Sequence, residues 1–161
     1  MDKNINIAQE IVKCRKDAVY FLRNYGCIKH PIRGAIKFDL YDYQEEVLIQ
    51  FLDNPYNIIL KGRQLGISVL CAGYVTWLMT FFRNKEILIL ATKGSVATNL
   101  VSKIKYFMSR LPDWMKSKIV IDNRQSIELS NGSKVQASTT TEDAGRSESV
   151  SLLIVDEAAF I

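Results

Sequence analysis

The sequence is poor in the residues that build disulfide frameworks and structural metal sites. Its 161 residues include three cysteines and one histidine. The cysteines, Cys14, Cys27 and Cys71, have no paired spacing, and together with His30 they form no recognisable zinc motif. An odd number of cysteines without an apolar targeting segment is typical of a reducing cytosol. The pattern therefore argues against a disulfide-stabilised secreted domain and against a zinc module.

Long apolar runs are also missing. The most apolar stretch, residues 69–82, is shorter than the roughly 20 residues that a transmembrane helix needs, so we expect a buried helix and no membrane partner. Hydrophobic residues make up 48% and charged residues 24% of the chain, which is typical of a soluble globular domain. The net charge of +4 favours a polyanionic partner without proving one.

The sequence does contain an alternation of helical and strand-like segments. The apolar spacing predicts four helices, over residues 7–24, 42–52, 68–82 and 96–111. A loop is expected over residues 26–37, and short buried strands are expected over 58–60, 86–91 and 152–155. Such alternation predicts an α/β fold with a mostly parallel sheet and helices on both of its faces.

Residues 118–137 interrupt this alternation. β-rich segments lie at 119–121, 126–129 and 134–137, and Asn131-Gly132 between the last two is a strong hairpin signal. We therefore expect a small antiparallel excursion, followed by a polar loop over residues 138–149.

Several polar side chains follow directly after predicted strands. They are Lys61, then Thr92 and Lys93, then Asp156 and Glu157. Ligands of open α/β sheets bind at the carboxyl ends of the strands. The sequence therefore predicts one shared site at this edge of the sheet.

Residues 61–68, Lys-Gly-Arg-Gln-Leu-Gly-Ile-Ser, form a variant of the phosphate-binding pattern G-x-x-x-x-G-K-[ST]. Ile67 occupies the usual lysine position, and Lys61 occupies the first position. Lys61 can still supply a cation to phosphates, and Ser68 can supply a hydroxyl to Mg²⁺. The predicted nucleotide-binding residues of this loop are Lys61, Gly62, Arg63, Gln64, Leu65, Gly66, Ile67 and Ser68.

Residues 151–160, Ser-Leu-Leu-Ile-Val-Asp-Glu-Ala-Ala-Phe, provide a second motif. An apolar strand that ends in two acids is typical of a Walker B segment. Asp156 would hold Mg²⁺, and Glu157 would orient or deprotonate the attacking water. A solvated acidic strand end is the alternative interpretation. Together the two motifs predict an ATPase with a P-loop NTPase fold of the RecA-like type.

Further candidate site residues have two interpretations each. Tyr43 and Gln44 precede the loop and suit an adenine base, by stacking and by an amide that both donates and accepts, but such residues also occur on ordinary helix surfaces. Arg63 could contact the γ-phosphate or form a salt bridge. Arg146 could act as an arginine finger toward a neighbouring subunit or be a surface residue.

Basic residues recur in the 93–110 region. They could contact a nucleic-acid backbone or form an ordinary solvated face. They are Lys93, Lys103, Lys105 and Arg110.

These motifs together resemble the large terminase subunit of tailed bacteriophages, a motor ATPase that packages DNA into proheads. The resemblance covers roughly residues 40–161 and rests on Tyr43-Gln44, on the 61–68 segment, on 91–95 and on 152–160. It implies Gln44 for adenine, Lys61 and Ser68 for phosphates and Mg²⁺, Asp156 for Mg²⁺, and Glu157 as the catalytic carboxylate. It also implies that Arg146 is an intersubunit finger.

The resemblance further implies ATP and Mg²⁺ as cofactors and double-stranded DNA as substrate. The implied partners are a portal protein, a small terminase subunit and further copies in a ring, in the host cytoplasm. The family's nuclease domain is absent from these residues, so we expect no DNA cleavage.

Two other functions remain open from the sequence. One is a different DNA-translocating or helicase-like P-loop ATPase, and the other is a nucleotide-binding module without turnover. We expect an N-terminal extension over residues 1–38 and an ATPase core over 39–161. Because the chain ends five residues after Asp156, we expect a sheet that is incomplete at its C-terminus, as in a fragment, an engineered domain or a split gene product.

Overall fold

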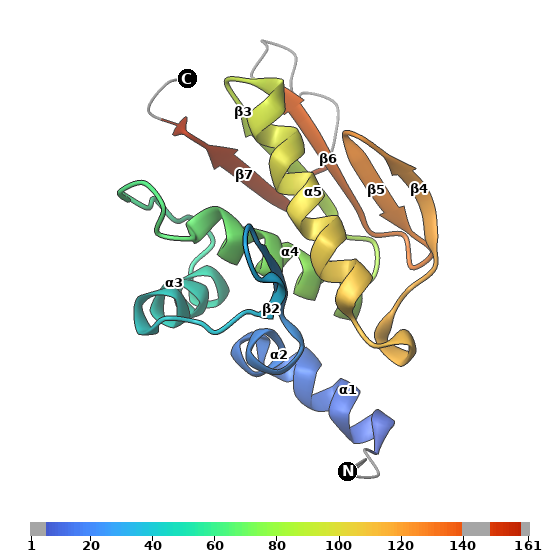
Figure 1. Cartoon of the computed structure of the whole chain (residues 1–161). Helices are drawn as coiled ribbons and strands as arrows, with labels where there is room; N and C mark the ends of the chain where they lie inside the picture. Colours follow the sequence, from blue (N-terminus) through green and yellow to red (C-terminus); the bar gives the residue numbers. More distant parts are fainter. Residues whose placement is uncertain (1–5, 140–148, 159–161) are drawn as a thin grey trace.

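The computed structural model describes residues 6–139 and 149–158 of the chain (Figure 1). Its helices are α1 (Ile7–Lys16), α2 (Ala18–Tyr25), α3 (Asp42–Asp53), α4 (Ile67–Phe81), α5 (Gly94–Arg110) and the short 3-10 helix η1 (Asp113–Met115). Its strands are β1 (Cys27–His30), β2 (Gly34–Lys37), β3 (Glu86–Ala91), β4 (Ile119–Asn123), β5 (Ser126–Leu129), β6 (Lys134–Thr139) and β7 (Leu152–Asp156). No described helix combines the length and the apolar character needed to cross a membrane.

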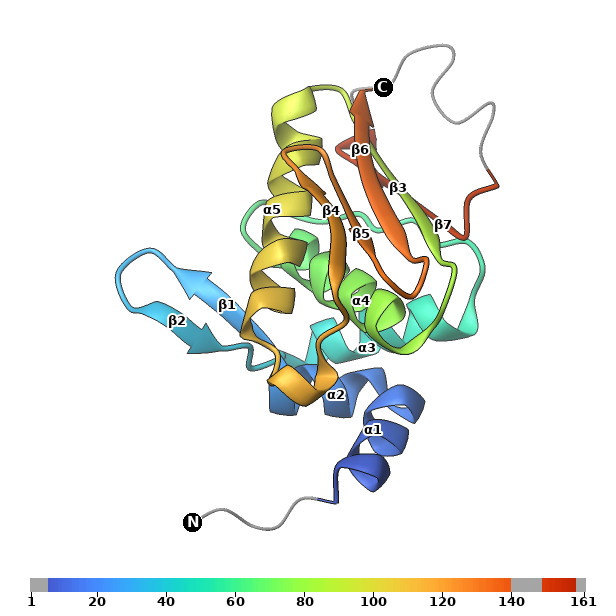
Figure 2. The same cartoon turned by 90° about the vertical axis from the view of Figure 1, so that its right-hand side faces the viewer.

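The main sheet has five strands in the order β4-β5-β6-β3-β7 (Figure 2). Strand β3 pairs in parallel with β6 and with β7, whereas β4–β5 and β5–β6 are antiparallel. The α/β class is confirmed, and the sheet is mixed rather than mostly parallel. The excursion over residues 118–137 explains the difference, since strands joined by tight turns pair antiparallel.

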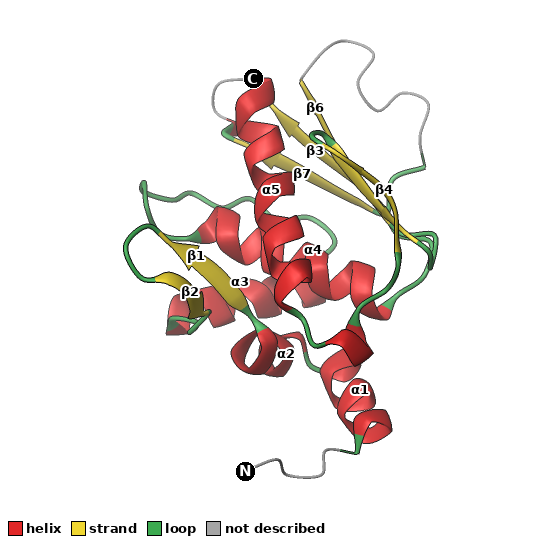
Figure 3. Cartoon of the chain, turned by 45° about the vertical axis from the view of Figure 1, so that its right-hand side comes forward, coloured by secondary structure: helices red, strands yellow, loops and turns green. Residues whose placement is uncertain are grey.

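Helices lie on one side of this sheet and not on both, as far as the described residues go (Figure 3). Successive side chains of a strand point to opposite faces. On β7, Leu152 and Ile154 pack against the core, whereas Leu153 and Val155 stay 52% and 40% exposed. The prediction of helices on both faces is therefore wrong for the part of the chain that the structure describes.

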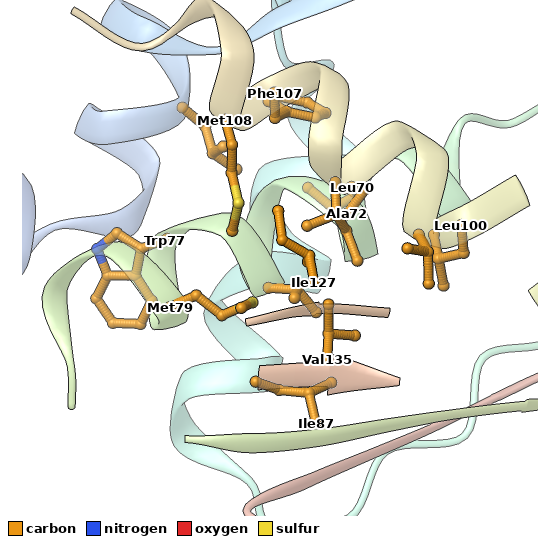
Figure 4. Close-up of a cluster of buried hydrophobic side chains, with 14 of the residues drawn as sticks. Leu70, Ala72, Trp77, Met79, Ile87, Leu100, Phe107, Met108, Ile127 and Val135 are labelled. Carbon is orange, nitrogen blue, oxygen red and sulfur yellow. The ribbon is translucent and has the colours of Figure 1, made fainter. Parts of the chain in front are cut away.

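The core lies between the sheet and helices α4 and α5 (Figure 4). Helix α5 buries a stripe at helical spacing, which includes Leu100, Ile104 and Phe107. Helix α4 is apolar on most sides, and Gly73 lets α2 approach it so closely that a Cβ atom would lie 2.8 Å from Leu22 Cδ2. The predicted helices over 42–52, 68–82 and 96–111 are confirmed.

The helix predicted over residues 7–24 is wrong as a single element. The chain leaves helical conformation at Asp17 (φ −134°, ψ 100°), whose side chain accepts the backbone N–H of Tyr20 at 2.8 Å and begins α2. An N-cap of this kind competes with a continuous helix. The carbonyl of Cys14 is then capped by the indole N–H of Trp77 at 2.8 Å, which ties α1 to α4.

The loop predicted over residues 26–37 is also wrong, because most of it forms the β1–β2 hairpin. Cys27 pairs with Lys37 and His30 with Gly34. The Nδ1 atom of His30 accepts the backbone N–H groups of Ile32 and Arg33 at 3.2 and 3.1 Å, which closes the turn.

The strand predicted over residues 58–60 is absent. Ile58 and Leu60 are fully exposed, and this segment pairs with no strand of the described residues. A strand is stable only when its backbone groups pair with a neighbour. The apolar pattern identified a segment with strand-like composition, but the described residues provide no neighbouring strand with which it could pair.

Candidate functional site at the carboxyl ends of β3 and β7

The segment 61–68, called here the 61–68 loop, leads into the N-terminus of α4. Gly66 caps the helix in the left-handed region (φ 71°, ψ 9°), and Gln64 also has a positive φ of 65°. A helix N-terminus leaves unpaired N–H groups and has a dipole that favours an anion. The loop therefore has the backbone features of an anion-binding site.

Helix α3 holds this loop in place. The Tyr43 hydroxyl and the Gln44 Nε2 both donate to the carbonyl of Leu65, at 2.8 and 3.1 Å. Gln44 is 2% exposed, and its Oε1 accepts the backbone N–H of Tyr41 at 3.2 Å. Both ends of the amide are therefore engaged within the chain in this structure. The role of Gln44 toward adenine stays a prediction.

The polar ends of α4 and β7 meet across 88 residues of sequence. The Ser68 hydroxyl donates to Oδ2 of Asp156 at 3.2 Å, and the backbone N–H of Glu157 donates to Oδ1 at 3.0 Å. Asp156 pairs with Ala91 at the end of β3, directly before Thr92 and Lys93. The predicted convergence of these strand ends is thus present for β3 and β7.

The pKa of the Cys71 thiol, one turn after Ser68, depends on the charges around the site. This pKa is raised to about 12, chiefly by burial and then by the Asp156 carboxylate, while the ammonium groups of Lys61 and Lys103 lower it. The thiol therefore responds to one carboxylate and two cations, of which Lys61 is exposed.

Other predicted site residues lie at the surface. Arg63 and Glu157 are exposed, and Glu157 has a positive φ of 58°, which is uncommon for a residue with a side chain. Arg146 lies outside the described residues. Of the basic residues, Lys105 binds Asp122 and the carbonyl of Asn123 rather than standing free.

The oxygen atoms of Ser68 and Asp156 are hard ligands, which suit Mg²⁺ better than a thiophilic metal. The described residues contain no group of three or more His, Cys, Asp or Glu side chains that could hold a metal. Mg²⁺ usually keeps water ligands and shares its protein ligands with substrate phosphates, so two protein oxygens are a sufficient donor set.

Residues 58–161 match the model of a protein family described as the terminase large subunit, T4likevirus-type, N-terminal. The chain belongs to this family. The match includes the 61–68 loop and β7, whereas α1 to α3 precede it. Membership in the terminase family supports a role in phage DNA packaging.

Tyr41 supports the site but was not among the predicted site residues. Tyr41 stacks on Tyr43, with ring centroids 5.6 Å apart and planes 8° apart, and its N–H binds Gln44. The signal was the three-residue spacing from Tyr41 to Gln44, which is the spacing of a capping box at a helix start. The terminase match begins at residue 58, so it gives no guidance on these α3 residues.

Proposed function

We propose that this chain binds Mg-ATP at the carboxyl ends of β3 and β7 and hydrolyses it to drive double-stranded DNA into a prohead. The observation that carries the proposal is the contact of the Ser68 hydroxyl with the Asp156 carboxylate at 3.2 Å. A loop hydroxyl beside an acid at a strand end is the arrangement that a magnesium–phosphate complex requires.

Phosphate groups would lie against the N-terminus of α4. The left-handed Gly66 ends the loop and exposes the first N–H groups of the helix. Lys61 would add a cation from the start of the loop, in place of the lysine that is missing at Ile67. Arg63, exposed in the turn of the loop, is the candidate contact for a terminal phosphate.

Ser68 and Asp156 would hold Mg²⁺, which when bound would neutralise charge on the phosphates. The Ser68 proton now lies between the two oxygens, and its hydroxyl would rotate to present a lone pair to the cation. The Asp156 carboxylate is held by the Glu157 N–H, which keeps its second oxygen directed at Ser68.

Glu157 would act on the attacking water. Its carboxylate follows the metal-binding carboxylate by one residue, and its left-handed backbone turns the chain at the end of β7. A carboxylate here can accept the proton of a water in line with the terminal phosphate. Arg146 would supply charge stabilisation from a neighbouring subunit.

The proposed partners follow from the family. They are double-stranded DNA, a portal protein, a small terminase subunit and further copies of this chain in a ring, in the host cytoplasm. Family membership favours this function over a helicase-like one. Binding without turnover is the remaining alternative.

Glu157→Gln separates these possibilities. The variant should retain affinity for a fluorescent ATP analogue and lose phosphate release by the whole chain, because an amide cannot accept the proton. Glu46→Gln, the same change at an exposed position of α3, is the matched control and should leave both unchanged.

Nucleotide binding without phosphate release in the unmodified chain would favour the binding module. Absence of both would contradict the proposed function. A Glu157→Gln variant that loses both nucleotide affinity and phosphate release would indicate that Glu157 binds the metal and does not activate water.

A further inference from the structure

Within residues 6–139 and 149–158, no strand pairs with the edge of the sheet opposite the candidate site. Strand β4 is the outermost strand there (Figure 2). All five of its residues are exposed. Three of them are consecutive β-branched residues: Ile119, Val120 and Ile121. Its pairing with β5 shifts register between Ile119 and Ile121. An exposed apolar edge strand offers unpaired backbone groups to another extended segment.

A cavity of about 570 Å³ adjoins this edge. It lies between the C-terminal half of α5 and the β4–β5 hairpin. Its apolar wall comes from the end of α5, the residue that follows it and the hairpin, and includes Met108, Leu111, Ile119, Ile127 and Leu129. Thr80 of α4 also lines it. A cavity of this size accommodates a bulky apolar side chain.

The surroundings of the cavity are basic. Residues 103–124 hold six lysines or arginines and two aspartates, so their net charge of +4 equals that of the whole chain. Lys105 and Lys116 line the cavity, and Lys118 directly precedes β4. The two aspartates, Asp113 and Asp122, already pair with Lys116 and Lys105. The surplus charge is therefore positive.

We propose that β4 and this cavity bind an extended acidic peptide segment of a partner protein. The segment adds a strand to the free edge of β4 and places an apolar side chain in the cavity. Its acidic residues lie beside Lys118 and Arg124. This is binding by strand addition, in which the backbone supplies affinity and alternate side chains supply specificity. The proposal goes beyond nucleotide binding, since it concerns the opposite edge of the sheet.

Duplex DNA is the rival occupant. Contacts to phosphates need positive charge but neither an apolar cavity nor unpaired strand groups. The coincidence of all three features at one edge favours the peptide.

The test uses a fluorescein-labelled peptide that alternates glutamate and valine, titrated with the whole chain and followed by fluorescence anisotropy. The peptide should bind, and a peptide that alternates lysine and valine should not. Val120→Pro removes a backbone donor from β4 and should weaken binding about tenfold, the effect of one lost hydrogen bond. Circular dichroism reports whether this variant folds.

Lys118→Glu provides a second test that leaves the strand backbone unchanged. It should weaken peptide binding roughly three- to tenfold. Lys29→Glu, the same charge reversal at an exposed position of β1, should not weaken it. Equal binding of both peptides, or equal effects of the two reversals, would overturn the proposal. So would failure of the peptide to bind while a DNA duplex binds in a Lys118-dependent manner, or dimerisation of the chain through β4 without peptide binding.

Discussion

The two ends of helix α4 lie in opposite environments. Its N-terminus emerges from the exposed 61–68 loop, and the Ser68 hydroxyl there contacts Asp156. Its C-terminal half is enclosed, with Val75 and Met79 fully buried and Trp77 6% exposed. One helix thus joins the candidate site to the core.

This difference separates stability from function along a single element. Burial of apolar surface contributes most of the free energy of folding, so the buried side chains of α4, from Leu70 to Met79, contribute to stability. At the N-terminus a few polar contacts and two left-handed residues, Gln64 and Gly66, set the geometry. Such sites are drawn from the less stable parts of a fold. Substitutions at the two ends should therefore have different consequences.

Trp77→Ala should have the largest effect on stability. It removes an indole that packs against Tyr74 and Phe82 and whose N–H caps the Cys14 carbonyl. Loss of a buried aromatic side chain typically reduces the free energy of unfolding by about 3–5 kcal/mol. Urea denaturation of the variant measures the loss. Trp77→Phe retains most of the packing and should lose roughly 1–3 kcal/mol through the uncapped carbonyl. Equal losses in the two variants would contradict a role for the hydrogen bond.

Gly66→Ala should have an intermediate effect at the site end of α4. A Cβ atom there would lie 2.6 Å from Gln44 Nε2, and the backbone has a φ of +71°. We expect a loss of about 1–3 kcal/mol in unfolding free energy, together with displacement of the Leu65 carbonyl from Tyr43 and Gln44. Gly94→Ala is the matched control, because its Cβ would meet Thr139 at an ordinary 3.5 Å. It should be neutral or stabilising.

Glu10→Gln should have a smaller effect on stability, and this effect should depend on pH. Hydrogen bonds from Tyr20 and then Tyr25, both 2.8 Å long, lower its pKa below the ordinary value of 4.5. A carboxyl with a depressed folded-state pKa stabilises the fold above its unfolded pKa, and this contribution is lost as the pH falls through the lower folded value. Thermal melts between pH 6 and pH 3 should therefore show a steeper decline for the unmodified chain than for Glu10→Gln. Parallel curves would show that the cluster contributes nothing.

The same contrast explains what the sequence could predict. Helices α3, α4 and α5 and strands β3 and β7 have strong local patterns, and each was predicted within two residues of its bounds. The break at Asp17 and the turn of the β1–β2 hairpin depend on hydrogen bonds that the side chains of Asp17 and His30 accept from backbone N–H groups, and periodicity does not contain these bonds. The strand expected over residues 58–60 depends on a neighbour, which is a non-local requirement.

The candidate site divides in the same way. The meeting of the carboxyl ends of β3 and β7 follows from the rule that parallel strands end at one edge, so it was predictable from the sequence. Ser68 reaches Asp156 from the N-terminus of α4, without the strand that was expected before the 61–68 loop. The contacts of Tyr43 and Gln44 with the Leu65 carbonyl were not, because they depend on side-chain conformations on a separate helix. Sequence motifs thus predicted that the ends of β3 and β7 meet, but not that Tyr43 and Gln44 hold the Leu65 carbonyl.

The most direct test of this account is the Mg²⁺ dependence of nucleotide affinity in Ser68→Ala. This variant should have the smallest effect on stability, within about 0.5 kcal/mol, because it removes one partly exposed hydroxyl. Titration of a fluorescent ATP analogue with and without Mg²⁺ should show that the ion strengthens binding to the unmodified chain and to Ser102→Ala, a control on the exposed side of α5. In Ser68→Ala that strengthening should be lost. Equal Mg²⁺ dependence in all three proteins would contradict the account.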